Sequence, residues 1–192
     1  MRIKCCGITR MEDAQYAESC GADAIGVVVF SGGVSRRMVS PDRAREIFGA
    51  VGPFTATVAV SHTKSEEDLR EMLALRPTAI QISHPFIFDE DPGVRIIRVI
   101  GRGDLLPDDC DAVIVDESHG QGKRFDLSYA REVVRYAKIP VILAGGLTPE
   151  NVAGAISQVH PYAVDVASGI ESSPGIKDHK KIAAFLAAAR SG

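Results

Sequence analysis

Eight short apolar runs alternate along the chain with segments of helical or loop character. Most of these runs are almost continuously apolar, for example residues 24–29 and 140–144. Such runs are typical of parallel strands, because other parts of the chain cover both faces of a parallel sheet. The strands are predicted at residues 2–6, 22–30, 54–61, 79–83, 94–100, 112–116, 140–144 and 163–167.

The segments between the strands predict six helices. Their start signals include Thr9 with Glu12, in the spacing of a capping box, and the hydroxyl residues Ser40 and Thr148, each before a proline. The helices are predicted at residues 10–19, 41–50, 65–76, 127–137, 148–160 and 178–190.

Two of the connections have the composition of loops. Residues 84–93 contain two prolines and a glycine, and residues 101–111 are similarly poor in helix formers. The pattern predicts an α/β fold, a compact (β/α)8 TIM barrel with degenerate crossovers after strands 4 and 5. The chain has 192 residues, whereas such barrels usually need at least about 200. An open doubly wound sheet is the alternative, but the single Gly7 is not the G-x-G-x-x-G motif of that fold. We expect one domain over residues 1–192.

Composition and charge exclude several classes of partner. The net charge is −3 without a long basic run, so neither nucleic acid nor a membrane surface is expected as a partner. No apolar stretch reaches the roughly 18 residues that span a bilayer. The chain begins in strand-like sequence without the pattern of a signal peptide. The four cysteines lack the spacing of a zinc site, so we expect reduced thiols, no metal and a cytoplasmic protein.

The last two predicted strands end in glycine-bearing turns. Strand 7 is followed by Gly145 and Gly146, and strand 8 by Ser168 and Gly169. In barrels of this type the loops after strands 7 and 8 often bind phosphate through backbone N–H groups. Two such turns together favour a phosphate site over the alternative, in which these glycines only allow tight turns.

The first predicted strand carries two adjacent cysteines at its carboxyl end, where barrels of this type have their catalytic residues. Cys5 and Cys6 point to opposite faces of the strand, and Cys6 lies nearer the strand end and the following helix. A helix N-terminus lowers the pKa of a nearby thiol, which favours its reactive thiolate form. The alternative is that each cysteine is a small buried apolar residue.

Two carboxylates and an arginine pair also lie at predicted strand ends or inside strands. Asp116 ends strand 6, and Asp165 lies within strand 8, where a buried carboxylate needs a partner or a function. Arg36 and Arg37, after strand 2, could clamp a carboxylate, although solvated surface charge is the usual fate of such a pair. The glycine-bearing loop 118–123 is suited to closing over an anionic ligand.

Taken together, these residues resemble the phosphoribosylanthranilate isomerase family of tryptophan biosynthesis. The resemblance spans nearly the whole chain and rests on the order and spacing of several motifs. These motifs lie at residues 4–9 with 12–14, 21–26, 35–41, 120–126, 144–152, 164–171 and 175–178.

The resemblance implies a cofactor-free Amadori rearrangement of a small-molecule phosphosugar. The family's catalytic cysteine precedes Gly-Ile-Thr, which selects Cys6 as the general base that removes the sugar C2 proton. The general acid matches Asp116, the anthranilate-carboxylate ligand matches Arg37, and the aspartate that orients sugar hydroxyls matches Asp165. Gln81 matches a glutamine at the end of strand 4 and is expected to contact substrate. The phosphate ligands match Gly145, Gly146, Ser168 and Gly169.

The chain departs from the family's pattern where the anthranilate ring would lie. Strand 4 ends in residues 81–84, with His84 displaced by one place, and residues 60–63, which include His62, read Val-Ser-His-Thr where the family usually has Val-Phe-Val-Asn. A related phosphosugar isomerase with a different aglycone therefore stays open, as does a non-catalytic barrel that binds a phosphate ligand. A thiol and an acid together favour the enzyme. The sequence is compatible with either a monomer or a homodimer.

Overall fold

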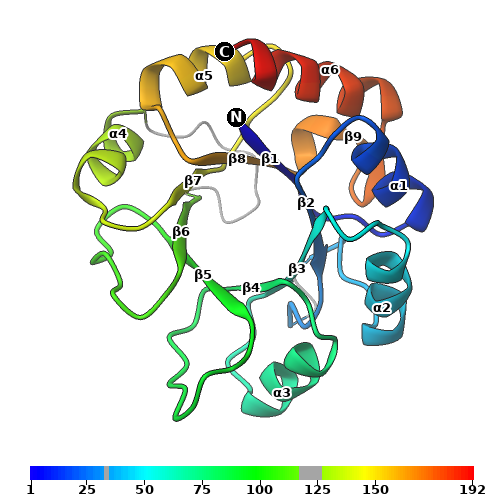
Figure 1. Cartoon of the computed structure of the whole chain (residues 1–192), viewed down its shortest axis with the longest axis vertical. Coiled ribbons are helices and arrows are strands. Elements are labelled where there is room, and N and C mark those ends of the chain that lie inside the picture. The colour runs from blue at the N-terminus through cyan, green and yellow to red at the C-terminus, as the bar shows by residue number, and fades with distance from the viewer. Residues whose placement is uncertain (33–34, 117–126) are drawn as a thin grey trace.

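The structure is a computed structural model that describes residues 1–32, 35–116 and 127–192. Within these residues, eight parallel strands pair in chain order and close into a barrel, because β1 pairs with both β2 and β8 (Figure 1). The predicted TIM barrel is confirmed. The strands are β1 (Arg2–Cys5), β2 (Ala24–Val28), β3 (Ala56–Ser61), β4 (Ala79–Ile82), β5 (Arg95–Ile100), β6 (Ala112–Val115), β7 (Val141–Leu143) and β8 (Ala163–Val166).

The helices lie where they were predicted, but two of their starts differ. Ser40 caps its helix as expected and accepts a hydrogen bond from the backbone of Arg43. Thr9 is not a cap, because its hydroxyl donates to the carbonyl of Gly175 instead. Thr148 precedes a turn rather than a helix, which begins only at Val152. The helices are α1 (Met11–Ser19), α2 (Pro41–Gly49), α3 (Glu66–Ala74), α4 (Leu127–Tyr136), α5 (Val152–Val159) and α6 (His179–Ser191).

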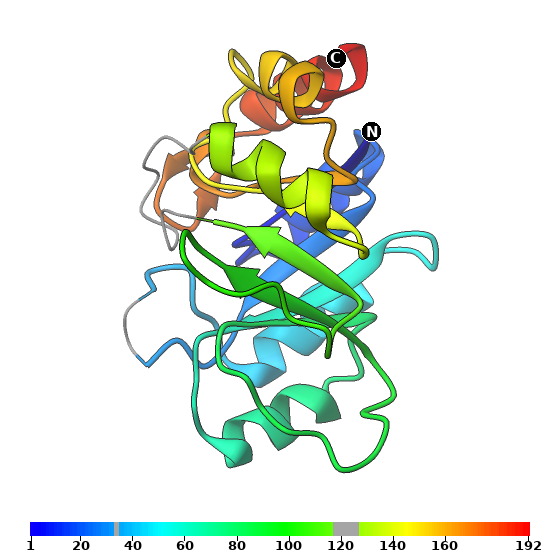
Figure 2. The ribbon, with the colours of Figure 1, turned by 90° about the vertical axis from the view of Figure 1, so that its left-hand side faces the viewer.

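The connections from β4 to β5 and from β5 to β6 contain no helix, and all of their residues are described. Figures 1 and 2 show loops on this flank, whereas α5 and α6 lie together on the flank that holds both chain ends. The degenerate crossovers are thus confirmed. The segment after β8 was not predicted: a 3-10 turn, η1 (Ser168–Ile170), leads into a small antiparallel hairpin of β9 (Glu171–Ser173) and β10 (Ile176–Lys177).

Alternation along the strands divides the buried residues into two layers. Ile3 and Cys5 of β1 belong to the large apolar cluster between the barrel and its helices. Cys6 belongs to a smaller cluster inside the barrel, with residues such as Val58 and Ile114. Lys4, on the same face as Cys6, is also buried. The barrel interior therefore combines apolar side chains with charged ones.

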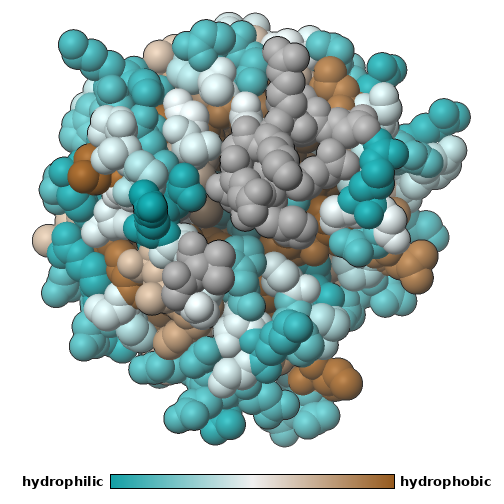
Figure 3. All heavy atoms as spheres, turned by 180° about the vertical axis from the view of Figure 1, so that it is seen from behind, coloured by the Kyte–Doolittle hydropathy of each residue, from teal (hydrophilic) through white to brown (hydrophobic). Residues whose placement is uncertain are grey.

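The surface seen from behind is mainly hydrophilic, with small scattered apolar groups (Figure 3). Among the described residues, no helix has both the length and the apolar character that a membrane crossing needs.

Candidate active site

A cavity of about 400 Å³ opens where the strands end. Its described lining includes five residues singled out in the sequence, which come from the ends of β1, β4, β6 and β8 and from the loop after β2. The structure therefore brings together side chains that are far apart along the chain. These five residues are Cys6, Arg37, Gln81, Asp116 and Asp165.

The thiol of Cys6 lies beside a buried network of polar groups. Lys4 donates from Nζ to Oδ1 of Asp165 at 2.8 Å and to Oε1 of Gln81 at 2.9 Å. Burial raises the pKa of Cys6, and the charge of Asp165 adds to this, while the ammonium of Lys4 lowers it by charge and by a hydrogen bond. The sulfur thus lies between groups that favour opposite protonation states.

The two carboxylates predicted for the site face the same cavity. Asp116 directly follows β6, and its backbone N–H donates to the carbonyl of Ile100. Burial raises the pKa of Asp165, Lys4 opposes the shift, and the charge of Asp116 adds to it. The carboxylates of Asp116 and Asp165 are therefore close enough to interact electrostatically.

Arg37 is held by a carboxylate that the sequence reasoning did not select. Its Nε and Nη2 each donate to Glu171 at 2.8 Å in a two-pronged contact, which does not use Nη1. Lys177 donates to the same carboxylate at 3.0 Å and to the carbonyl of Ala167 at 2.9 Å. Burial works to raise the pKa of Glu171, but these two cations outweigh it, so the pKa is lowered.

The glycine-bearing turns after β7 and β8 meet. Gly145 and Gly146 have φ values of +90° and +62°, which favour glycine. A Cβ on Gly169 would stand only 1.9 Å from the carbonyl oxygen of Leu147, so the two turns are in close backbone contact. The four predicted phosphate ligands are thus gathered at one edge of the barrel. They do not line the cavity, but Ala167, immediately before Ser168, does.

His62 and His84, which stand near the departures from the family pattern, have different surroundings in the structure. His62 lines the cavity, with Nδ1 2.9 Å from the hydroxyl of Ser83. His84 packs edge-on against Phe86 and is not among the described lining residues. The loop 118–123, suited in sequence to closing over an anion, lies outside the described residues.

Three charged residues of the site were not selected from the sequence: Lys4, Glu171 and Lys177. For Lys4 a signal existed, since it stands two positions before Cys6 and must share its face of the strand. For Glu171 and Lys177 the signal was weak, because they flank a hairpin that local sequence did not predict. In the described part of the chain, no group of three or more His, Cys, Asp or Glu side chains is placed to hold a metal ion.

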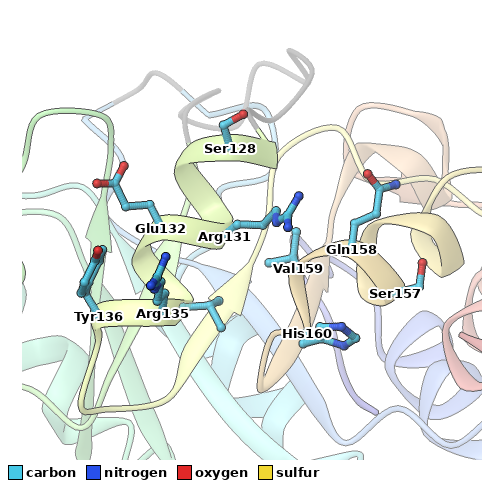
Figure 4. A pocket seen from close by; sticks show the side chains of 10 residues that line it. Ser128, Arg131, Glu132, Arg135, Tyr136, Ser157, Gln158, Val159 and His160 are labelled. Atoms are coloured by element: carbon cyan, nitrogen blue, oxygen red, sulfur yellow. The ribbon is translucent and has the colours of Figure 1, made fainter.

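A wider hollow of about 760 Å³ lies on the outer surface, between α4 and α5 (Figure 4). It is lined by exposed polar side chains, among them Arg131, Arg135 and His160. None of the predicted site residues lines it, and it lies outside the barrel. The smaller cavity at the strand ends is therefore the candidate active site.

Comparison with known proteins gives a consistent result. Residues 3–188 match the family model described as N-(5'phosphoribosyl)anthranilate (PRA) isomerase. An N-(5'-phosphoribosyl)anthranilate isomerase from Methanoregula boonei is 65% identical over 190 residues, which cover 99% of this chain and 97% of the relative.

Solved structures agree with the sequence relatives. A phosphoribosyl anthranilate isomerase from Thermus thermophilus superposes with a TM-score of 0.85 at 34% identity, covering 100% of this chain and 99% of that one. Another, in complex with reduced 1-(o-carboxyphenylamino)-1-deoxyribulose 5-phosphate, has a TM-score of 0.81 at 30% identity and full coverage of both chains (100% each). The chain therefore belongs to the phosphoribosylanthranilate isomerase family, whose members are enzymes of tryptophan biosynthesis.

Proposed function

We propose that this chain converts N-(5-phosphoribosyl)anthranilate into 1-(2-carboxyphenylamino)-1-deoxyribulose 5-phosphate, with Cys6 as general base and Asp116 as general acid. The observation that carries the proposal is that a thiol from β1 and a carboxylate after β6 line one cavity. These two elements are not neighbours in the barrel. A base and an acid can therefore reach different atoms of one bound sugar.

The reaction needs only proton transfers and no cofactor. Asp116 protonates the ring oxygen as the bond from that oxygen to C1 breaks, which leaves a C1–nitrogen iminium ion. The Cys6 thiolate then removes the C2 proton, and the C–H electrons form a C1–C2 double bond while the iminium electrons return to nitrogen. The resulting enaminol gives up its hydroxyl proton while C1 takes up a proton, which forms the ketose, and the proton on Cys6 returns through solvent to the Asp116 carboxylate, so that both groups are reset. Substrate and product are isomers, so no oxidant or reductant is required.

The remaining site residues would hold the substrate. Arg37 is pre-oriented by Glu171 and would bind the anthranilate carboxylate, which suits the two-pronged geometry of a guanidinium. Asp165 and Gln81 would orient sugar hydroxyls. The turns that carry Gly145, Gly146, Ser168 and Gly169 would bind the phosphate through backbone N–H groups.

The cavity is built within one chain, so a monomer or a homodimer would house the reaction equally well. All four cysteines are free, which fits the reducing conditions of the cytoplasm, where we place the protein.

A direct assay tests the function. Purified protein is mixed with freshly generated phosphoribosylanthranilate, and its fluorescence is followed; we expect it to fall as substrate is consumed. Tight binding without turnover would instead support the non-catalytic phosphate-binding barrel. Absence of binding would support an isomerase for another aglycone.

The acid is tested by Asp116→Asn. We expect kcat to fall by about 10²–10⁴-fold, since the amide cannot deliver the proton that opens the ring. Binding of the reduced product analogue, measured by calorimetry, and the melting temperature should change little. Near-normal turnover in this variant would remove Asp116 from the proposed mechanism.

A further inference from the structure

Lys4 is a buried cation whose position inside the barrel needs an explanation. It is 4% exposed and lies on β1, two residues before Cys6 and on the same face. Its register partner on β8 is Asp165, with which it forms an ion pair at 2.8 Å. Taking two charges out of water is costly, so an apolar pair would serve stability as well or better. A purely structural role therefore explains Lys4 poorly.

Gly26 of the neighbouring strand makes room for the Lys4 ammonium and the thiol together. A Cβ at this position would stand 2.9 Å from Sγ of Cys6 and 3.1 Å from Nζ of Lys4. The φ value of Gly26 is not positive, so the backbone does not require glycine there. Because Gly26 has no Cβ, it leaves space for the sulfur of Cys6 and the ammonium of Lys4, which both lie next to it.

We propose that Lys4 is a positioning residue for proton abstraction, whose ammonium stabilises the thiolate form of Cys6 and keeps the sulfur beside the bound sugar. This inference rests on the proposed role of Cys6 as general base. Asp165 and Gln81 anchor the ammonium, so Lys4 keeps its own proton while the thiolate accepts one from the substrate. Lys4 thus remains in place through the whole catalytic cycle.

The charges around the thiol agree with this role. Cys6 is faced by Lys4 on β1, Asp165 on β8, Lys177 on β10 and Arg37 after β2. The pKa of Cys6 is raised overall, by burial and by the charge of Asp165, and Lys4 opposes this shift by charge and by hydrogen bonding. Lys177 and Arg37 are both engaged by the carboxylate of Glu171, which offsets their effect. Burial works to lower the pKa of Lys4, but Asp165 and Cys6 outweigh it, so the net shift is upward and the ammonium persists.

The test measures the thiol without any substrate. The rate of Cys6 alkylation by iodoacetamide is followed against pH by mass spectrometry, and fragment ions separate Cys6 from the adjacent Cys5. We expect Lys4→Met to raise the alkylation midpoint by at least about one pH unit, so that alkylation below both midpoints is about tenfold slower or more. The acidic limb of the pH profile of kcat/KM should move in the same direction, with activity partly recovered at high pH.

A second background guards against misfolding. Lys4→Met alone leaves Asp165 buried without its cation, which can destabilise the fold. In Asp165→Asn that unpaired charge is absent, and adding Lys4→Met to it should still raise the midpoint relative to Asp165→Asn alone. Lys138→Met, which removes an exposed lysine before β7, is the matched control and should leave the midpoint unchanged.

An alkylation midpoint that stays unchanged when Lys4 is replaced in both backgrounds overturns the proposal, whatever happens to turnover. Because alkylation requires no isomerase activity, this outcome is distinct from a failure of the proposed function. The role of Cys6 itself is tested separately, by substitution of the sulfur.

Discussion

Two adjacent cysteines have different surroundings, because Cys5 faces the layer outside the barrel and Cys6 faces the barrel interior. Cys5 faces the layer between strands and helices, where a continuous apolar cluster surrounds it, and burial raises its pKa to about 12. Cys6 faces the interior, where burial and Asp165 also raise the pKa of the thiol, but the ammonium of Lys4 opposes this shift through a hydrogen bond as well as by charge. One step along a pleated strand therefore separates an inert packing group from a candidate base.

The comparison shows what the interior supplies that the outer layer does not. A thiol is reactive only as the thiolate, and an apolar layer disfavours that charge. The interior contains the ion pair of Lys4 and Asp165, with the neutral amide of Gln81 as a further partner of Lys4, and Arg37 and Glu171 form a second ion pair at the open end of the barrel. These groups can remain charged because each has a partner within hydrogen-bond distance.

The largest expected effect comes from making the same substitution, cysteine to serine, at each of the two positions. We expect Cys6→Ser to lower kcat/KM by about 10²–10⁴-fold, because a hydroxyl is a far weaker base than a thiolate at neutral pH, with little change in melting temperature. Cys5→Ser should keep its activity but lose about 1–3 kcal/mol of stability, since it buries a hydroxyl among apolar groups. Steady-state kinetics and chemical denaturation measure both effects. Loss of turnover in Cys5→Ser with normal turnover in Cys6→Ser would reverse the assignment.

The next largest effect concerns the ion pairs that Glu171 forms with Arg37 and Lys177 at the open end of the barrel. Glu171→Gln leaves Arg37 and Lys177 without their carboxylate, so we expect a loss on the order of 3 kcal/mol in the free energy of unfolding at neutral pH. The folded-state pKa of Glu171 is lowered, so its stabilisation is present above the ordinary glutamate pKa and is lost as pH falls through the folded value.

The difference between wild type and Glu171→Gln should therefore shrink in acid. Denaturant titrations of both proteins, from about pH 7 down to about pH 3, give this difference directly. A gap that stays constant over this range would mean that Glu171 does not stabilise the fold as a carboxylate.

The smallest effect compares a glycine at the barrel mouth with one in the helical layer. Gly169→Ala would place a Cβ against the Leu147 carbonyl, so we expect a loss of about 1–3 kcal/mol and a raised KM, as the phosphate turns separate. Gly154→Ala lies inside α5 with its nearest neighbour, Nε2 of Gln158, 4.0 Å away, and should gain about 0.5–1 kcal/mol with KM unchanged. Thermal melts and substrate titrations test the pair, and equal effects in both variants would argue against a phosphate site at the strand 8 turn.

Much of the fold could be predicted because its signals are local. Apolar runs such as residues 140–144 mark strands wherever both faces are buried, and prolines in 84–93 exclude a helix there. The cap at Ser40 was predicted correctly, since its signal depends only on adjacent residues. Thr9 was misread as a cap because its hydroxyl binds Gly175, a partner 166 positions away that local spacing does not reveal.

The same distinction applies to the site. Cys6 and Asp116 stand at strand ends and Asp165 lies within strand 8, so the barrel topology alone predicts that they converge. Glu171 and Lys177 depend on the hairpin after β8, whose two strands comprise only three and two residues, too short for a periodic signal. Their role became visible only from the contacts that they make with Arg37.

The pairing of β1 with β8 also has a consequence for synthesis of the chain. Lys4 and Asp165 are separated by 161 positions, and β8 is the last of the eight barrel strands to leave the ribosome. A nascent chain therefore exposes its thiols long before the partner that anchors the neighbouring ammonium exists. Isomerase competence thus requires the closed barrel, and the appearance of turnover during translation would report that β8 has paired with β1.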